Sequence, residues 1–571
     1  MARGSRIDRE FKNLPTDVTD YVRRLVRMIG YRRKVRREVQ RELLSHFADA
    51  LRDGPSPEEA RARAEQLMAE FGDPELLAML CRRAKKRCRP LWLKAIGGGR
   101  MGLFLTIVAL SSYTAWFVSG KPVVTDEYLL KRNQLGRPQL RVSDNAWPHY
   151  EKAASLFVEA DEELKETSAV KYNRLNKFQG FAAMADKDRK ALVAWVAANE
   201  PAWAYYEGAS RKSYCHWQCR YDRSLPNVPS LMEITQNPWL AHLRHLAEVG
   251  IWRVRLAAEE GHIDEAFDNC LVVARVGSHL QIAAGLIDQL VGRALGAMAR
   301  SELLRIVTEQ DLSEAVLLDL QTQLAVRYPD GYPFANFEGE RLMVLDAVQH
   351  SFTEGGPGGG HLIPGQFVGF ASHAWELPNT RRVKVFQRVL LWPMDVGISM
   401  IHARRDKTVA RIHEVYDEIG DRSRISPYQR RARHIGDVEE LGNSMNIYRY
   451  GLIRMLLPAE GRVSELAFRL RGDHEAALTV LSLKRYYLDK GAYPSDLKSL
   501  VDAGYLKRVP MDPFSDGPLI YRRLGDEFLL YSVGRDFVDG GGTRGVDDEG
   551  EPRIWAENGD RVFWPFRGLP E

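Results

Sequence analysis

Residues Met101–Val118 read MGLFLTIVALSSYTAWFV, a run of 18 residues without a charged side chain. As a helix rising 1.5 Å per residue, this run would be roughly 27 Å long, enough to cross the hydrocarbon core of a bilayer. The aromatic pair Trp116 and Phe117 at its far end is typical of a membrane interface. The sequence therefore predicts a transmembrane helix here, in preference to a buried helix of a globular core.

The charges on either side of this segment predict its orientation. Residues 1–100 contain 24 Lys and Arg against 14 Asp and Glu, a net charge of +10, whereas residues 101–571 contain 57 against 62, a net charge of −5. Because an excess of Lys and Arg marks the cytoplasmic side, we expect a cytoplasmic N-terminus in the inner cell membrane and an extracytoplasmic, periplasmic bulk. Some 100 mostly hydrophilic residues precede the apolar run, which favours a retained anchor over a cleaved signal peptide.

The overall composition limits the class of protein. Of the 571 residues, 45% are hydrophobic and 27% are charged, which is typical of a folded chain and excludes a disordered or polytopic membrane protein. The length predicts several separate cores, and five cysteines are too few for a disulfide-built scaffold. Beside a membrane anchor, the basic N-terminal part favours anionic lipid head groups as its partner, and we expect no nucleic acid partner.

The N-terminal part has the pattern of a small helical bundle. Apolar residues recur at three- and four-residue intervals between residues 17 and 83. The stretch 54–59 (GPSPEE) indicates a helix stop followed by Ser56 as an N-cap, with Pro57 in the first helical turn. We expect a helix over Pro57–Phe71 that ends at Gly72, followed by a short fourth helix.

This bundle resembles a known cytoplasmic domain. The segments 36–47 (RREVQRELLSHF), 56–60 (SPEEA) and 71–75 (FGDPE) are similar to the helical HAAS domain, which is related to the permease prefix domain and precedes membrane segments in bacterial proteins. The resemblance covers about 65 residues. It implies a regulatory or partner-binding head and no catalytic residues.

Beyond the anchor, the pattern is mostly helical. Residues 246–266 (LAEVGIWRVRLAAEEGHIDEA) have the form of one tetratricopeptide-like helical hairpin. The glycine-rich stretch 355–360 (GGPGGG) lacks the preceding strand, following helix and lysine of a phosphate-binding loop, so we expect a surface loop there. The segments 145–154 (NAWPHYEKAA), 219–222 (CRYD), 257–266 (AAEEGHIDEA) and 334–340 (FANFEGE) together resemble large membrane-anchored proteins of unknown function from Planctomycetes.

The C-terminal residues predict a different fold. The stretches 486–514 (YYLDKGAYPSDLKSLVDAGYLKRVPMDPF), 519–523 (LIYRR), 528–542 (FLLYSVGRDFVDGGG) and 560–565 (DRVFWP) look like the globular core of the major pseudopilin of type II secretion, the protein G type. The residues themselves indicate a helix over Glu475–Lys490 and a β-hairpin turning at 524–526. The resemblance implies a three-stranded sheet. A pseudopilin begins with a short leader and an apolar helix, so here we expect a borrowed fold and no fibre subunit.

The same resemblance implies a calcium site. In that family the loop after the Tyr-Ser-x-Gly stretch binds calcium through clustered carboxylates, which correspond here to Asp536, Asp539, Asp547 and Asp548, with Glu549 beside them. Hard oxygen ligands on flexible backbone suit Ca²⁺. The alternative is a solvated acidic turn, because the spacing does not match an EF-hand. No other cofactor is expected.

Three cysteines lie beyond the anchor, and their state is left open by the sequence. Cys215, Cys219 and Cys270 could form one disulfide, remain buried free thiols, or hold a metal together with His216. The pair His242 and His245 has metal-site spacing but no third ligand at a matching interval, which favours ordinary surface or core histidines. No serine-hydrolase, zinc-hydrolase or nucleotide-binding motif is evident.

Together these patterns predict a mainly α protein with a small C-terminal α+β part. The expected divisions are a cytoplasmic head (1–96), a transmembrane helix (101–118), a linker (119–144), a helical domain (145–330), an irregular glycine-rich segment (331–374), a helical segment (375–473) and the pseudopilin-like module (474–571). We expect a single-pass, membrane-anchored interaction or structural protein with protein partners in the cell envelope. A membrane-tethered envelope hydrolase and a transmembrane signalling protein are the alternatives.

Overall fold

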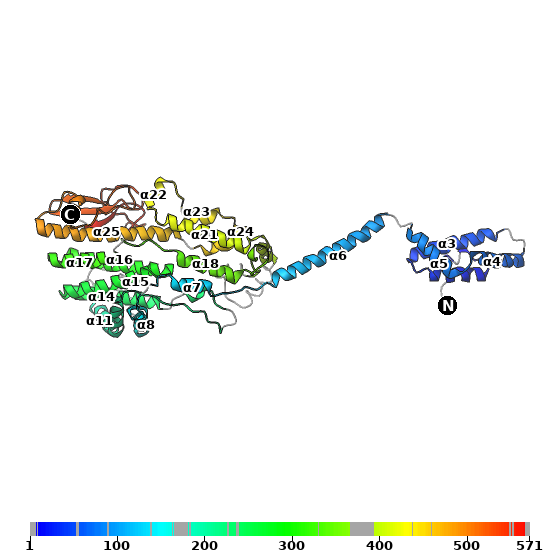
Figure 1. Ribbon diagram of the computed structural model, residues 1–571, viewed down its shortest axis with the longest axis horizontal. Coiled ribbons are helices and arrows are strands. Elements are labelled where there is room, and N and C mark those ends of the chain that lie inside the picture. Colours follow the sequence, from blue (N-terminus) through cyan, green and yellow to red (C-terminus); the bar gives the residue numbers. More distant parts are fainter. Residues whose placement is uncertain are drawn as a thin grey trace. The chain divides into compact units, whose positions relative to one another are not determined.

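The computed structural model is mainly helical with a small antiparallel sheet (Figure 1). It describes residues 7, 10–52, 56–87, 91–137, 140–162, 164, 181, 184–224, 228–235, 239–328, 331–365, 393–436, 438–457, 460–547, 550 and 553–565. The chain forms two compact units, Met1–Phe117 and Val118–Glu571. They are called the N-terminal unit and the large unit below.

The N-terminal unit contains the expected helical bundle. Its helices are α2 (Thr16–Met28), α3 (Arg33–Ala50), α4 (Pro57–Phe71) and α5 (Pro74–Arg87). The predicted start and stop of α4 are confirmed: the Ser56 side chain accepts the Glu59 N–H at 3.4 Å, and Gly72 has φ +75°. Helix α5 is 14 residues long, longer than the short helix that the sequence predicts.

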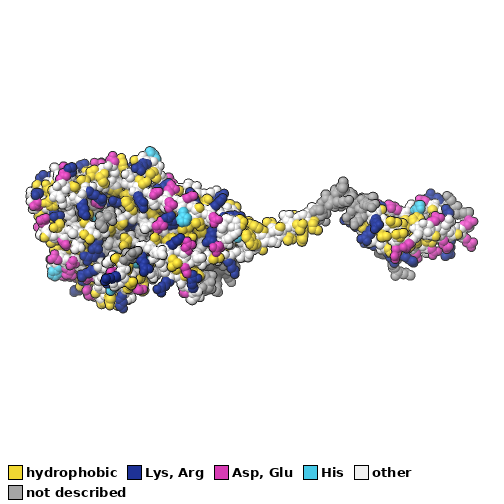
Figure 2. All heavy atoms as spheres, viewed as in Figure 1, with side chains coloured by type: hydrophobic (Ala, Val, Ile, Leu, Met, Phe, Trp, Pro, Cys, Tyr) yellow, Lys and Arg dark blue, Asp and Glu magenta, His cyan; other side chains and the backbone are white. Residues whose placement is uncertain are grey.

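The predicted apolar helix is also present. Helix α6 (Leu91–Val118) contains the stretch Met101–Val118, which is long and apolar enough to cross a membrane. Only 6% of this stretch is buried within the structure, and Figure 2 shows hydrophobic side chains exposed along the helix. Leaving large apolar side chains in water is unfavourable by about 1.5–3 kcal/mol each, so a lipid environment suits this helix.

The large unit contains a helical body and a C-terminal α+β part. The helices of its first half are α7 (Glu127–Gln134), α8 (Trp147–Leu156), α11 (Asp186–Ala198), α12 (Glu200–Ser210), α13 (Leu231–Ile234), α14 (Leu240–Glu259), α15 (Ile263–Gln281), α16 (Leu286–Glu309), α17 (Glu314–Val326) and α18 (Glu338–Ser351), with the 3₁₀ turns η1 (Val142–Asp144) and η3 (Pro357–Gly359). Those of the second half are α21 (Arg405–Arg422), α22 (Pro427–Ala432), α23 (Val438–Ser444), α24 (Ile447–Leu456), α25 (Glu460–Lys490) and α26 (Leu497–Asp502).

Close helix packing forms the centre of the body. Helices α14, α15 and α16 pack against one another, and α15 and α16 meet at two glycines. A Cβ atom at Gly277 would lie 2.8 Å from the Gly292 carbonyl oxygen, and one at Gly292 would lie 2.6 Å from the Gly277 carbonyl oxygen. Only glycine allows this approach, because any side chain would separate the two backbones.

The glycine-rich region differs from the sequence prediction. Within the segment 331–374, which was expected to be irregular, residues Glu338–Ser351 form helix α18. Its residues Leu342, Leu345 and Val348 recur at three-residue intervals and are buried, so helical periodicity was present beside the glycines. The part of the predicted helical segment between 375 and 392 lies outside the described residues.

The C-terminal part consists of one long helix and the sheet. Strands β1 (Ile520–Leu524), β2 (Glu527–Ser532) and β3 (Arg561–Trp564) pair antiparallel in the order β1-β2-β3. The predicted hairpin is confirmed, with Gly525 in its turn at φ +65°. Helix α25 starts at Glu460, earlier than the expected Glu475, and therefore runs across the expected boundary at 473.

A buried aspartate fixes the corner between α26 and β1. The Asp512 side chain accepts hydrogen bonds from the Phe514 N–H at 2.9 Å, the Ser532 hydroxyl at 2.7 Å and the Val533 N–H at 3.0 Å. Burial raises the pKa of this carboxyl above its ordinary value, although these donors oppose the shift. One side chain therefore satisfies donors from two segments about 20 residues apart.

We predict that Asp512→Ala lowers the free energy of unfolding of the large unit by about 1–3 kcal/mol, because buried donors lose their acceptor. Urea denaturation of the full chain in detergent, followed by tryptophan fluorescence, measures the effect. The matched control is Asp516→Ala, an exposed aspartate four residues away, which should leave the midpoint unchanged. Equal midpoints for both variants would contradict this role of Asp512.

Candidate functional site

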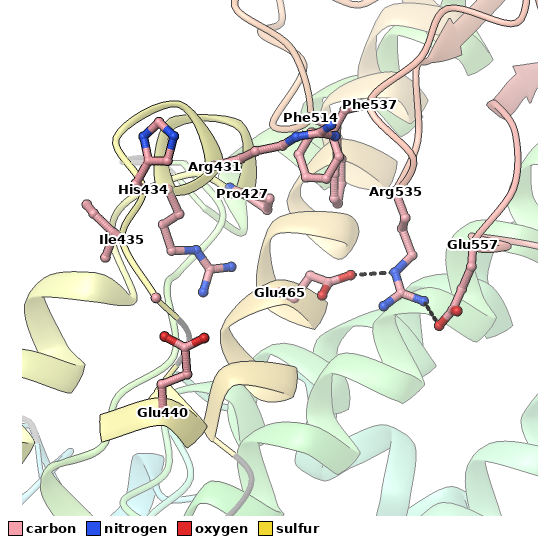
Figure 3. A pocket seen from close by; sticks show the side chains of 12 residues that line it. Pro427, Arg431, His434, Ile435, Glu440, Glu465, Phe514, Arg535, Phe537 and Glu557 are labelled. Atoms are coloured by element: carbon pink, nitrogen blue, oxygen red, sulfur yellow. Dashed lines mark hydrogen bonds and ion pairs between the residues drawn. The ribbon is translucent and has the colours of Figure 1, made fainter. Parts of the chain in front are cut away.

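A cavity of about 670 Å³ lies where the segment 427–440, helix α25 and the C-terminal loops meet (Figure 3). Its volume is within the range of ligand-binding pockets. The lining residues are Pro427, Arg430, Arg431, His434, Ile435, Gly436, Glu440, Glu465, Phe514, Arg535, Phe537 and Glu557. Most of these side chains are polar or charged, so the cavity suits a polar ligand.

Short-range interactions position the α22 wall of the cavity. Helix α22 begins at Pro427, and the side chain of Ser426 caps it by accepting the Gln429 N–H at 3.2 Å. The Tyr428 N–H donates to the Pro513 carbonyl at 3.2 Å, which attaches the helix to the Asp512 corner.

Arg431 connects the α22 wall of the cavity to the C-terminal loop. Its guanidinium donates to the Asp536 carbonyl at 3.2 Å and lies 4.6 Å from the centre of the Phe537 ring. A cation placed over an aromatic face is attracted by the ring quadrupole. Figure 3 shows Arg431 beside Phe514 and Phe537 at the upper edge of the cavity.

Strained backbone gathers around this cavity. Within the described ranges, the non-glycine residues with left-handed φ are His434 (+53°), Phe537 (+63°) and Trp555 (+56°). His434 and Phe537 line the cavity, and the Trp555 ring lies 5.1 Å from the ring of Phe514, another lining residue. Such conformations cost on the order of 1–3 kcal/mol each and occur preferentially at binding and catalytic sites.

An ion-pair chain crosses one side of the cavity. The Glu465 carboxylate accepts from the Arg469 Nε at 3.0 Å and from the Arg535 Nε at 2.6 Å. Arg535 also donates to Glu557 at 2.7 Å. Figure 3 shows Arg535 reaching between the two glutamates. Glu465 is on α25, whereas Arg535 and Glu557 are on the C-terminal loops. The ion-pair chain therefore joins two walls of the cavity.

These contacts determine the protonation state of the Glu465 carboxylate. Burial alone would raise the pKa of Glu465, but the hydrogen bonds and charges of Arg469 and Arg535 outweigh it and hold the pKa below the ordinary value. Burial likewise opposes the charge on Arg535, yet Glu465 and Glu557 raise its pKa. Glu465 therefore stays ionised at neutral pH and is unsuited to donate a proton as a general acid.

Glu440 contributes a second carboxylate to the cavity. It is exposed, and a Cβ atom at Gly436 would lie 1.9 Å from its Oε2 atom, so glycine at 436 leaves room for this side chain. With Arg430, Arg431 and Arg535 against Glu440, Glu465 and Glu557, the formal charges of the lining cancel. The cavity therefore offers both signs of charge to a ligand.

The sequence alone does not indicate this site. Its charged residues come from α22, α23, α25 and the C-terminal loops, and Glu465 and Arg535 are 70 residues apart. The only local signal is the break at Ser426-Pro427, which marks a helix start but does not indicate which residues face it.

The three cysteines of the large unit are free and buried. They belong to different apolar clusters: Cys215 with Trp203 and Tyr206, Cys219 with Leu129 and Leu231, and Cys270 with residues of the C-terminal core. Burial raises the pKa of all three thiols, that of Cys219 to about 11, which makes them poor nucleophiles. Of the alternatives that the sequence left open, the structure has the free thiols.

The acidic residues of the expected calcium site are held by their own loop. Asp536 accepts the Val538 and Gly559 N–H groups at 3.0 and 2.7 Å. Asp539 accepts the Tyr531 hydroxyl at 2.8 Å and the Gly541 N–H at 2.9 Å.

Of the remaining expected calcium ligands, Asp547 lies within the described residues. Asp547 accepts the Gly550 N–H through its main-chain carbonyl at 3.0 Å, and Asp548 lies outside the described residues. In the part of the chain that the structure describes, no group of three or more His, Cys, Asp or Glu side chains could hold a metal ion. Calcium binding stays a prediction.

The histidine pair has a packing role. The rings of His242 and His245 each lie 5.7 Å from the ring of Phe157, and His242 also lies 5.7 Å from the ring of Trp239. These contacts connect α14 to the end of α8 and agree with the expectation of ordinary histidines.

Comparison with known proteins gives no further assignment. No family model, no curated protein and no solved structure matches this chain. The geometry of the cavity and the properties of α6 are therefore the basis for a functional proposal.

We predict that Glu465→Gln lowers the free energy of unfolding by about 1.5–3 kcal/mol at pH 7, because Arg469 and Arg535 lose a charged acceptor. The folded-state pKa of Glu465 is lowered from 4.5. The stabilisation that ionised Glu465 contributes is thus fully present above its ordinary pKa, and it is lost as the pH falls through the lowered pKa of the folded state. The difference between wild type and variant should shrink below about pH 4.

Thermal unfolding of the full chain between pH 3 and 8 measures this difference. The matched control is Glu414→Gln, which breaks the exposed pair with Arg411 at 2.9 Å and should change stability little. A difference that grows on acidification would contradict the assignment.

Proposed function

We propose that this protein is a single-pass protein of the inner cell membrane, with its N-terminus in the cytoplasm and its large unit in the periplasm, where the large unit binds a protein partner. The observation that carries the anchor is the exposure of α6. An apolar stretch of 18 residues that is only 6% buried fits lipid far better than water. The Lys and Arg excess before it supports the orientation.

The cavity supports binding as the role of the large unit. It has the volume of a ligand pocket and lies among the residues with left-handed backbone, and its lining offers guanidinium groups and carboxylates together. A polypeptide segment that carries both acidic and basic side chains complements such a lining. We therefore infer that the partner is a protein that inserts a charged segment.

The chemistry of the cavity favours binding over hydrolysis. A hydrolase that uses paired carboxylates needs one of them protonated near neutral pH. Glu465 has a lowered pKa and is held by two guanidinium groups. No observation at this site favours the membrane-tethered hydrolase or a signalling role over binding.

The N-terminal unit supports a contact with anionic lipid head groups. Helix α5 exposes Leu76, Met79 and Leu80 on one side, while Ala78 on the other side is buried in the bundle. Arg82 and Arg83 follow on the exposed surface. Apolar and cationic side chains together on a helix surface suit the membrane interface.

We also propose that the bundle belongs with HAAS-like domains and the C-terminal part with the pseudopilin-like fold. What supports the first is the succession of α2 to α5 before an apolar helix. What supports the second is the order of a long helix, a buried Asp512 corner and a three-stranded sheet. The likeness concerns fold, and no activity is inferred from it.

The topology is tested by reporter fusions. We predict that alkaline phosphatase fused after Asp144 is active and that a fusion after Lys85 is inactive, because the enzyme matures only outside the cytoplasm. A green fluorescent reporter at the same two sites should give the opposite pattern. The same side for both positions would remove the proposed anchor.

Binding at the cavity is tested by photocrosslinking in intact cells. We predict that a photoreactive residue in place of Ile435, which lines the cavity, crosslinks one defined protein. Adding Glu440→Lys should lower that crosslink at least tenfold, because it reverses a charge on the lining. The matched control is Glu414→Lys on α21, which should leave the crosslink unchanged. An unchanged crosslink with Glu440→Lys would contradict binding at this cavity.

A further inference from the structure

The chain length places one surface of the large unit close to the end of α6. The apolar stretch ends at Val118, and Pro122 pairs with Thr353 in an isolated antiparallel bridge. The four-residue connection from Val118 to Pro122 can span at most about 14 Å. If α6 crosses a bilayer, the surface around Thr353 therefore lies near the bilayer boundary, however the two units are oriented.

Two helix ends adjoin this position. The Phe352 ring lies 5.6 Å from the ring of His402, which follows a helical stretch at residues 393–401. The Ala403 N–H donates to the Arg449 carbonyl at 2.9 Å, so the start of α24 lies beside the end of that stretch. Thr353, the stretch 393–401 and the first turn of α24 thus form one end of the large unit.

This end exposes several large apolar side chains. Between 44% and 62% of the surface of each is exposed, and the residues are Met394, Met400, Ile401, Ile447 and Tyr448. We call them the Ile401 face. Single exposed apolar residues are ordinary, whereas several on adjoining elements mark a contact surface.

Cations outnumber carboxylates around the Ile401 face, although Glu354 pairs with Arg405 at 3.7 Å and Asp406 is exposed beside it. Residues 393–405 and 441–454 contain Arg404, Arg405, Arg449 and Arg454, whereas Asp395 is their only carboxylate. Asp395 is 1% exposed and accepts the Gly365 N–H inside the structure. The face therefore presents apolar side chains and cations to its surroundings, the combination that suits an anionic membrane surface.

We propose that the Ile401 face rests in the head-group region of the outer leaflet, as a second membrane contact in addition to α6. Tyr448 is well suited to this depth, because its ring is apolar and its hydroxyl can remain hydrated. The proposal rests on the proposed membrane anchor and adds that the large unit lies against the bilayer by this end. The membrane is favoured over a protein occupant by the short connection to α6 and by the excess of cations over carboxylates.

Lipid-dependent fluorescence quenching tests the proposal. Full-length protein with Cys81→Ser and Cys88→Ser carries a single added cysteine, Ile401→Cys or Tyr448→Cys, labelled with an NBD fluorophore. The buried thiols of the large unit stay unlabelled in the folded state. The protein is reconstituted in nanodiscs of phosphatidylcholine and phosphatidylglycerol, with or without lipid that carries a shallow doxyl quencher.

Two control positions make the result decisive. Met511→Cys is 59% exposed before substitution and belongs to the C-terminal part, which lies at the opposite end of the large unit from α24 (Figure 1). Val108→Cys lies within the apolar stretch of α6 and reports the anchor itself. We expect at least twofold stronger quenching at positions 401 and 448 than at 511, and strong quenching by a deep doxyl lipid at 108.

Each outcome separates the hypotheses. The second contact would be overturned, and the anchor left intact, if position 108 is quenched but positions 401 and 448 are quenched no more than position 511. A lack of quenching at 108 would overturn the anchor and this inference with it. A blue shift at 401 and 448 that depends on protein concentration and not on quencher lipid would indicate a second copy as occupant and would also overturn the proposal.

Discussion

Helix α25 packs into two hydrophobic cores of the large unit, and this packing determines how the rest of the unit is arranged. Near its start, Val463 belongs to the core formed with α18, α21 and α24. Further along, Ala476, Val480 and Leu483 belong to the core shared by α16, α17 and the C-terminal sheet. An uninterrupted helix of 31 residues fixes the distance and the rotation between these cores, since its turns cannot slip independently. Glu465, two residues after Val463 on α25, forms part of the wall of the candidate site.

The cavity depends on the same arrangement. Its α22 wall is attached through Tyr428 to the Asp512 corner, and its opposite wall consists of loops that follow β2. Because Glu465 of α25 pairs with Arg535 of those loops, charge complementarity and core packing hold the walls in the same position. The lowered pKa of Glu465 is a consequence of that preorganisation, and it makes this carboxylate unsuited to donating a proton.

Local features of the fold were predictable from the sequence, and long-range ones were not. The capped helix Pro57–Phe71, the hairpin at Gly525 and the apolar stretch of α6 each depend on residues within a few positions of one another. The continuity of α25 across residue 473 was missed because residues 460–473 were assigned to a separate helical segment. Helix α18 was missed because the neighbouring glycines led to an irregular prediction for the whole segment. The pairing of Glu465 with Arg535 has no counterpart in sequence spacing, since it follows from tertiary packing over 70 residues.

The left-handed residues around the cavity differ in what their side chains contribute to stability. At His434, Phe537 and Trp555 a glycine would adopt the observed backbone with less strain. Phe537 and Trp555 pack in the C-terminal core, where Trp555 is only 8% exposed, whereas His434 is exposed to solvent. At Trp555 the loss of the buried ring, about 3–5 kcal/mol, would outweigh the strain that glycine relieves, so glycine would favour the fold only at His434.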